Sequence, residues 1–352
     1  MRAITIATAI AFFLALATGP AEAKLPCDAK DKACLLAAAK KSPVRTLDFW
    51  AKQLAKPVNE RFGPAPQELV DYLEIDNALN GYAEKPRAAR LSPAFLADAR
   101  GAFEDLLPVL RKVAGPTFAG VYFLEDLGTT GFTDAVREKP GAKPAAAFIV
   151  LDAKVLEKHR ANAWATWKEN TPFKPGGGWT LEAKIEEPEN DDRRGAIRYI
   201  LLHELGHVVA ATRDLHPMWD LAPKDLPPDA KYPFFDLSWT IDRAKNTYAS
   251  KHDATFPLRK SVVYYLGAKL EARQMAPAYR ALDATSFPSL YGATHFGEDF
   301  AESFASYVHT VILKRPWRIR ILKDGHPDLT YRTCWDDPRC IEKREILENL
   351  LK

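Results

Sequence analysis

Two histidines and a glutamate stand close together in the segment Ile197–Thr212, which reads IRYILLHELGHVVAAT. His203 and His207 are four positions apart, so on a helix both imidazoles project from one face and can bind the same metal ion. Glu204 lies about 100° further round such a helix, where its carboxylate can reach a water on that metal. Two neutral imidazoles suit Zn²⁺, which makes a bound water acidic enough to act as a nucleophile, with Glu204 as the general base.

The residues around this HExxH motif favour a buried helix. Most are helix formers or apolar, and Asn190, Asp191 and Asp192 offer capping oxygens and negative charge where a helix would begin. We therefore predict a helix over about 192–212. The alternative is a core helix with two hydrogen-bonded histidines, but an unpaired Glu204 in such a helix would be costly to bury.

A third protein ligand is needed, because a catalytic zinc site has three protein ligands and one open position. His216 is near in sequence, but Pro217 follows it and the helix has ended by then. Glu298 and Glu302 lie one turn apart in a predicted helix within 291–314, whose apolar stripe argues against two solvated carboxylates. We expect Glu298 to be the ligand and Glu302 to accept an N–H from a ligating imidazole; Glu302 as the ligand is the alternative.

This constellation resembles the gluzincin peptidases, in which HExxH is followed downstream by a helix that carries ExxxE or ExxxD. Among them it looks most like the catalytic domain of the anthrax-lethal-factor type. The resemblance rests on HELGH at 203–207, on EDFAE at 298–302, and on Tyr291, seven residues before Glu298. A metzincin is excluded, because the positions that would hold Gly and His carry Ala210 and Arg213.

The resemblance implies a set of roles for the matching residues. Zn²⁺ would be held by His203, His207 and Glu298, with Glu204 as the base and Tyr291 as a donor to the oxyanion. The resemblance covers roughly residues 116–315 and gives no information on the substrate.

The segments before the motif helix predict a sheet. Residues 118–124 and 145–152 are rich in β-branched and aromatic side chains, and 179–185 alternates like a strand. The stretch 128–143 is turn-rich, and 155–170 predicts a helix. Strands followed by an HExxH helix are the layout of the zincin fold, an α+β architecture in which an edge strand can hold an extended peptide. Either 145–152 or 179–185 is expected to be that edge.

The chain divides into regions that differ in composition and in predicted secondary structure. Residues 24–115 predict a mainly helical N-terminal region, and 116–330 predict a zincin-like domain in which a twisted sheet and the HExxH helix precede a helical C-terminal part. The proline- and aromatic-rich stretch 213–260 is an insertion, either a lid over the site or a structural wrap. The chain is expected to be helical again over 261–282, and 331–352 forms a cysteine-bearing tail with a short helix.

The N-terminus and the cysteines predict export. Residues 1–23 combine a positive start, an apolar stretch and the cleavage pattern Ala21-Glu22-Ala23, which together are typical of a signal peptide. Four cysteines form two close pairs, Cys27 with Cys34 and Cys334 with Cys340, which in an oxidising compartment predict two local disulfides. A zinc cluster of all four thiolates is the alternative. A periplasmic or secreted protein is expected.

The charge and apolarity of the chain limit which binding partners can be expected. The formal net charge is +3 and stays +3 once residues 1–23 are removed, because that segment contains one Arg and one Glu, which argues against a nucleic-acid partner. No stretch after the signal is apolar and long enough to span a membrane. The expected function is an exported zinc peptidase acting on a peptide or protein. A catalytically silent zincin-fold protein of an envelope or secretion assembly, or an amidase acting on cell-wall peptides, is the alternative.

Overall fold

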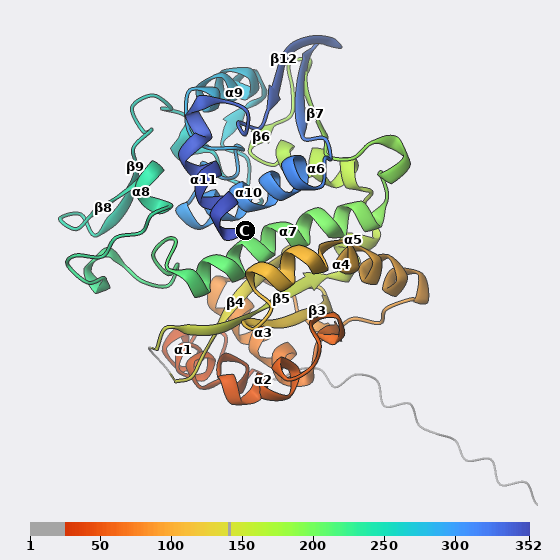
Figure 1. Cartoon of the computed structure of the whole chain (residues 1–352), viewed down its shortest axis with the longest axis vertical. Coiled ribbons are helices and arrows are strands. Elements are labelled where there is room, and N and C mark those ends of the chain that lie inside the picture. Colours follow the sequence, from red (N-terminus) through yellow and green to blue (C-terminus); the bar gives the residue numbers. More distant parts are fainter. Residues whose placement is uncertain (1–24, 140–141) are drawn as a thin grey trace, which may run out of the picture.

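Helices and strands are mixed along the described chain, which confirms the α+β prediction (Figure 1). The computed structural model describes residues 25–139 and 142–352, so the signal predicted at 1–23 lies outside the described residues. The helices are α1 (Lys32–Lys41), α2 (Leu47–Leu54), α3 (Gln67–Asn80), α4 (Pro93–Val113), α5 (Ala153–Glu157), α6 (Ala161–Asn170), α7 (Arg193–Arg213), α8 (Phe235–Ser238), α9 (Met275–Asp283), α10 (Phe296–Tyr307) and α11 (Ile341–Leu350). The strands are β1 (Phe62–Pro64), β2 (Arg87–Ala88), β3 (Phe118–Glu125), β4 (Gly131–Arg137), β5 (Pro144–Asp152), β6 (Phe173–Lys174), β7 (Trp179–Lys184), β8 (Trp239–Asp242), β9 (Thr247–Ser250), β10 (Leu270–Glu271), β11 (Arg318–Lys323) and β12 (His326–Arg332).

The main sheet has the strand order β1-β3-β5-β4, and β2 also pairs with β3. Strands β1, β3 and β5 run parallel, while β4 is antiparallel to β5 and forms one edge. Successive side chains of β5 enter different cores: Ile149 and Leu151 pack with α4 and α7, and Phe148 and Val150 pack with α1–α3. Because both faces are covered, the strand reads as one continuous apolar run. Figure 1 shows α1–α3 and α7 on opposite sides of this sheet.

Helix α7 carries the HExxH motif and lies between the main sheet and α10 (Figure 1). It matches the helix predicted over 192–212. The carboxylate of Asp192 accepts a hydrogen bond from the backbone N–H of Gly195 at 2.7 Å, which caps the first turn. Most residues of α7 are buried, so packing on several sides holds the helix in place.

Helices α7 and α10 approach each other closely at Gly206. A Cβ atom at this position would lie 2.7 Å from the Cα of Ala301 in α10. Residues 291–295 of the predicted helix form a turn before α10, closed by a hydrogen bond of 3.0 Å from the Thr294 N–H to the Tyr291 carbonyl. The close contact holds the two histidines of α7 and the glutamates of α10 at a set separation.

Neither of the two segments predicted as the edge strand is the edge of the main sheet. Segment 145–152 is β5, which is interior because it pairs with both β3 and β4. Segment 179–185 contains β7, which belongs to a separate antiparallel sheet with β11 and β12. The edge beside α7 is β4, within the stretch 128–143 that we read as turns. This strand is stabilised by its pairing with β5, a tertiary contact that the turn-rich local sequence does not indicate.

Two helix predictions also need correction. The segment 261–282 becomes helical only late, in a short 3₁₀ turn (Ala272–Gln274) and then in α9, because Tyr265 and Gly267 adopt positive φ angles of 65° and 93°. The run of β-branched and aromatic residues before them disfavours a helix. The predicted helix 155–170 is divided into α5 and α6.

The insertion 213–260 is ordered and packs against α10. Phe234 lies 4.9 Å from Phe300 between ring centroids, and Phe235 lies 5.4 Å from Phe296. The indole N–H of Trp239 donates to Asp299 at 3.0 Å. These contacts make much of the insertion a structural wrap around the helix that bears the two glutamates.

The cysteines pair locally, as predicted: Cys27 with Cys34 and Cys334 with Cys340. Four thiolates therefore do not form one metal cluster, and two disulfides suit an exported protein. Within the described residues, none of the helices has the length and apolarity that a membrane span requires.

We predict that Gly206→Ala lowers the free energy of unfolding by about 1–3 kcal/mol, because the new methyl group meets backbone atoms of α10. Gly101→Ala is the matched control, since it also lies inside a helix but its Cβ would meet only the flexible end of Arg194 at 2.9 Å. The control should be neutral or slightly stabilising. Urea unfolding of both variants checks this, and equal midpoints would contradict the close contact.

Candidate metal centre

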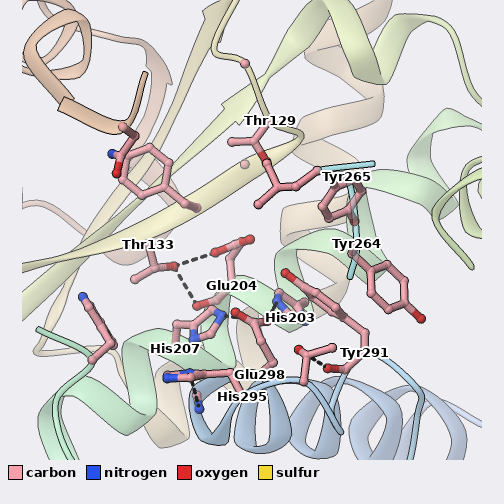
Figure 2. A pocket seen from close by; sticks show the side chains of 18 of the residues that line it. Thr129, Thr133, His203, Glu204, His207, Tyr264, Tyr265, Tyr291, His295 and Glu298 are labelled. Carbon is pink, nitrogen blue, oxygen red and sulfur yellow. Dashed lines mark hydrogen bonds and ion pairs between the residues drawn. The ribbon is translucent and has the colours of Figure 1, made fainter. Parts of the chain in front are cut away.

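The structure brings together His203, His207 and Glu298 from two helices that are distant in sequence (Figure 2). Their ligand atoms all lie within 4.8 Å of one another. Oε2 of Glu298 is 3.2 Å from Nε2 of His203 and 3.6 Å from Nε2 of His207. The HExxH helix and the first turn of α10 therefore point their donor atoms at one place.

This donor set fits a tetrahedral zinc ion. Two ligands bound to zinc at about 2.0–2.1 Å lie about 3.3 Å apart, close to the two distances found here. Oε2 of Glu298 is buried and has no aligned hydrogen-bond donor. Burial opposes protonation of His203, but the adjacent Glu298 and Glu302 carboxylates outweigh it and raise the pKa of this imidazole. The pocket therefore favours a positive charge between these groups.

Glu302 lies behind His203, one turn along α10 from Glu298. Its Oε1 is 3.0 Å from Nδ1 of His203, the ring nitrogen that faces away from Glu298. Its Oε2 accepts a hydrogen bond of 2.7 Å from the Ser289 hydroxyl, and the Lys168 ammonium donates to Oε1 at 2.9 Å. Burial would raise the pKa of Glu302, but Lys168 and His203 lower it to about 2, so the group stays a carboxylate that can orient the imidazole.

The carboxylate of Glu204 lies in the same cleft, held by a residue of β4. The Thr133 hydroxyl is 2.9 Å from Oε2 of Glu204 and 3.0 Å from its backbone carbonyl oxygen (Figure 2). Burial raises the pKa of Glu204, and the two motif histidines partly oppose the shift. A carboxylate with a raised pKa in this position is suited to accept a proton. Nothing in the turn-rich sequence around Thr133 marked it as part of the site.

Tyr291 precedes α10 and lies against the first motif histidine. Its ring stacks on His203 with centroids 5.6 Å apart and planes 26° from parallel. Figure 2 shows its phenol oxygen directed into the pocket, toward His203. Burial raises the pKa of Tyr291 well above its usual value, and the nearby Glu298 charge adds to this, so the phenol keeps its proton and can donate it in a hydrogen bond.

His216, the other candidate for third ligand, lies outside the cluster. Its Nδ1 is 2.6 Å from the Pro217 carbonyl oxygen, and its ring contacts Phe296 at 5.3 Å between centroids. Burial lowers the pKa of His216 to about 3. The residue is therefore a neutral imidazole packed behind α10.

The donor atoms open into a cleft of about 640 Å³. One wall is the start of β4 and the C-terminal part of α3, and the other is the loop 262–266. Trp219 of the insertion and His295, which caps α10, lie beside His207. Sequence reasoning did not identify these lining residues, because each comes from a segment without a recognisable motif. Trp219 is the one member for which the aromatic-rich insertion offered a signal.

Comparisons of the chain with protein-family models, with curated proteins and with solved structures returned no match. The likeness to gluzincins therefore depends on the motif residues and on the geometry described above.

The geometry predicts different metal affinities for two glutamate variants. Glu298→Ala removes one of three ligands and its charge, so it should bind zinc much more weakly than Glu302→Ala. Losing an orienting carboxylate typically costs about 10–100-fold in affinity or activity, so Glu302→Ala should still bind zinc. Titration of both variants with zinc against a competing chelator measures the difference. If Glu302→Ala were the weaker binder, the ligand would have to be Glu302.

Proposed function

We propose that this protein is an exported zinc-dependent peptidase that uses a water molecule to hydrolyse peptide bonds. The observation that supports this most strongly is the arrangement of Glu204 beside three converging donor atoms, those of His203, His207 and Glu298, in one open cleft. A site that only stored metal would have no need of a buried carboxylate next to the ligands but outside the ligand set.

The chemistry divides between the ion and the chain. Zn²⁺ bound by these three residues would supply Lewis acidity, which lowers the pKa of water and stabilises negative charge on oxygen. Glu204 accepts a proton from the attacking water as its oxygen bonds to the peptide carbon. The same carboxyl then gives that proton to the amine nitrogen as the C–N bond breaks.

Tyr291 is proposed to stabilise the tetrahedral oxyanion. Its protonated phenol points into the cleft beside His203, from where the hydroxyl can donate to the oxygen that gains negative charge (Figure 2). Glu302 holds the ring of His203 in one orientation through Nδ1, which leaves Nε2 free to face the ion.

An extended peptide suits the cleft because one side of β4 pairs with β5, while its other edge carries, among the described residues, a single bridge, from Arg137 to Thr46, and the start of the strand borders the cleft. Gly131, Phe132 and Thr133 of this strand line the site. A peptide laid along such an edge can make main-chain hydrogen bonds with it, as an added strand does. This feature favours peptides over compact substrates that lack an extended backbone.

Two experiments separate the peptidase from the alternatives. Purified protein is incubated with unfolded casein and with cell-wall peptides, with and without a chelator, and the cleavage of a mixed peptide library is analysed by mass spectrometry. Chelator-sensitive cleavage is expected. Zinc at one per chain without any cleavage would favour a silent binding protein, and cleavage of cell-wall peptides alone would favour an amidase.

We predict that Glu204→Gln keeps zinc near one per chain but lowers hydrolysis by about 10²–10⁴-fold, because it loses the general base. The amide oxygen can still accept from Thr133, so the local structure is preserved. Elemental analysis and a casein assay measure the two quantities. Loss of zinc in this variant would mean that Glu204 is a ligand.

Tyr291→Phe tests the oxyanion donor. Removing one such donor typically lowers kcat by about 10²–10³-fold, while KM and zinc content should stay near those of the wild type. The phenyl ring can still stack on His203, so packing is retained. A variant with normal kcat would reduce Tyr291 to a packing residue.

A further inference from the structure

A buried lysine lies directly behind the metal centre. Lys168 of α6 is 4% exposed, and it does not line the cleft. An ammonium group is costly to remove from water unless it is paired with negative groups. The proposed mechanism assigns no role to this charge, yet its position is well defined by its contacts.

The contacts of Lys168 connect two parts of the site. Its Nζ lies 2.9 Å from Oε1 of Glu302 and 3.3 Å from Oε1 of Glu169. The same nitrogen lies 4.5 Å from the centroid of the Tyr291 ring. The other oxygen of Glu169 accepts hydrogen bonds from Tyr264 at 2.8 Å and from Tyr279 at 2.7 Å, which anchors that carboxylate away from the metal.

We propose that Lys168 is a positioning residue of the metal centre, which holds the Glu302 carboxylate against Nδ1 of His203 and supports the ring of Tyr291. The same oxygen of Glu302 lies next to both the lysine and the imidazole. The inference rests on the metal centre of the proposed function, but not on peptide hydrolysis.

Electrostatics explains why one cation is needed here. Glu169 and Glu302 are 3% and 1% exposed, and two carboxylates buried near one ammonium would repel each other if it were removed. Glu169 is held by two tyrosine hydroxyls, whereas the hydroxyl of Ser289 holds only the other oxygen of Glu302. Glu302 is therefore the carboxylate expected to move, and His203 would lose the partner that sets its orientation. The ammonium at the Tyr291 ring also makes a cation–π contact that fixes this ring beside His203.

The chain offers a matched control, a second buried lysine whose carboxylate partner also lies on α10. Lys343 of α11 is 1% exposed and donates to Asp299 of α10 at 2.5 Å, so it too is a buried lysine paired with a carboxylate. Its ammonium lies against the rings of Phe234 and Phe287, each 5.0 Å from the centroid. Removing it should disturb packing and stability in a similar way, but it contacts neither Glu302 nor Tyr291.

The test is a zinc titration against a competing chelator, at a temperature where circular dichroism shows every variant to be folded. Lys168→Met should weaken zinc binding by about 10–100-fold, as loss of an orienting carboxylate does, and Lys343→Met should keep the wild-type affinity. Lys168→Met added to Glu302→Ala should cause little further loss, because the lysine acts through that glutamate. Wild-type affinity in Lys168→Met, or fully additive losses in the double variant, would overturn the proposal.

A second variant protects the test against misfolding. Lys168→Gln removes the charge but keeps amide N–H donors for the buried carboxylates, so it should fold where methionine does not, and should show a smaller loss of zinc affinity. Wild-type affinity in this folded variant would also overturn the proposal. Because the titration uses no substrate, it remains decisive even if the protein cleaves no peptide.

Discussion

The close contact between α7 and α10 determines the geometry of the site. Only a glycine at position 206 allows the two helices to approach so closely, since a Cβ there would lie 2.7 Å from the Cα of Ala301. In α7, His203 and His207 lie on either side of Gly206. In α10, Glu298 and Glu302 lie on either side of Ala301. The same contact therefore sets both the packing of the two helices and the separation of the Glu298 carboxylate from the imidazoles.

Charge compensation is the second constraint on this site. Glu204 and Glu302 are buried and Glu298 is half-buried around the two imidazoles, and such a concentration of carboxylates is unfavourable without cations. Lys168 compensates the charge on the inner side of His203, and the donor atoms on the cleft side are arranged for an ion. With the proposed zinc ion in place, the site would combine a permanent cation in the core, Lys168, with an exchangeable one that faces the cleft.

The sequence predicted those features that depend on local spacing. The helix after Asp192, the shared face of His203 and His207, and the turn between Glu298 and Glu302 follow from 3.6 residues per turn. The sequence did not predict the features that depend on contacts between distant segments. Thr133 reaches Glu204 because β4 pairs with β5, and Lys168 reaches Glu302 across 134 positions of sequence. The periodicity of the sequence predicts neither contact. The zincin identity is a proposal because the comparisons with known proteins returned no match.

The walls of the cleft come from segments that carry no catalytic motif, and this has a consequence for specificity. Apart from the site residues and histidines, Asp76 of α3 is the charged side chain among the described residues that line it. Burial and the nearby Asp134 raise the pKa of Asp76 to about 6, so this carboxyl can gain or lose its proton near neutral pH. The remaining wall is largely aromatic and aliphatic, including Phe132, Trp219 and Tyr265. In the proposed mechanism His203, Glu204, His207 and Glu298 act on any peptide bond, so selection among peptides would come from these walls. They include part of the N-terminal region, because α3 contributes to one of them.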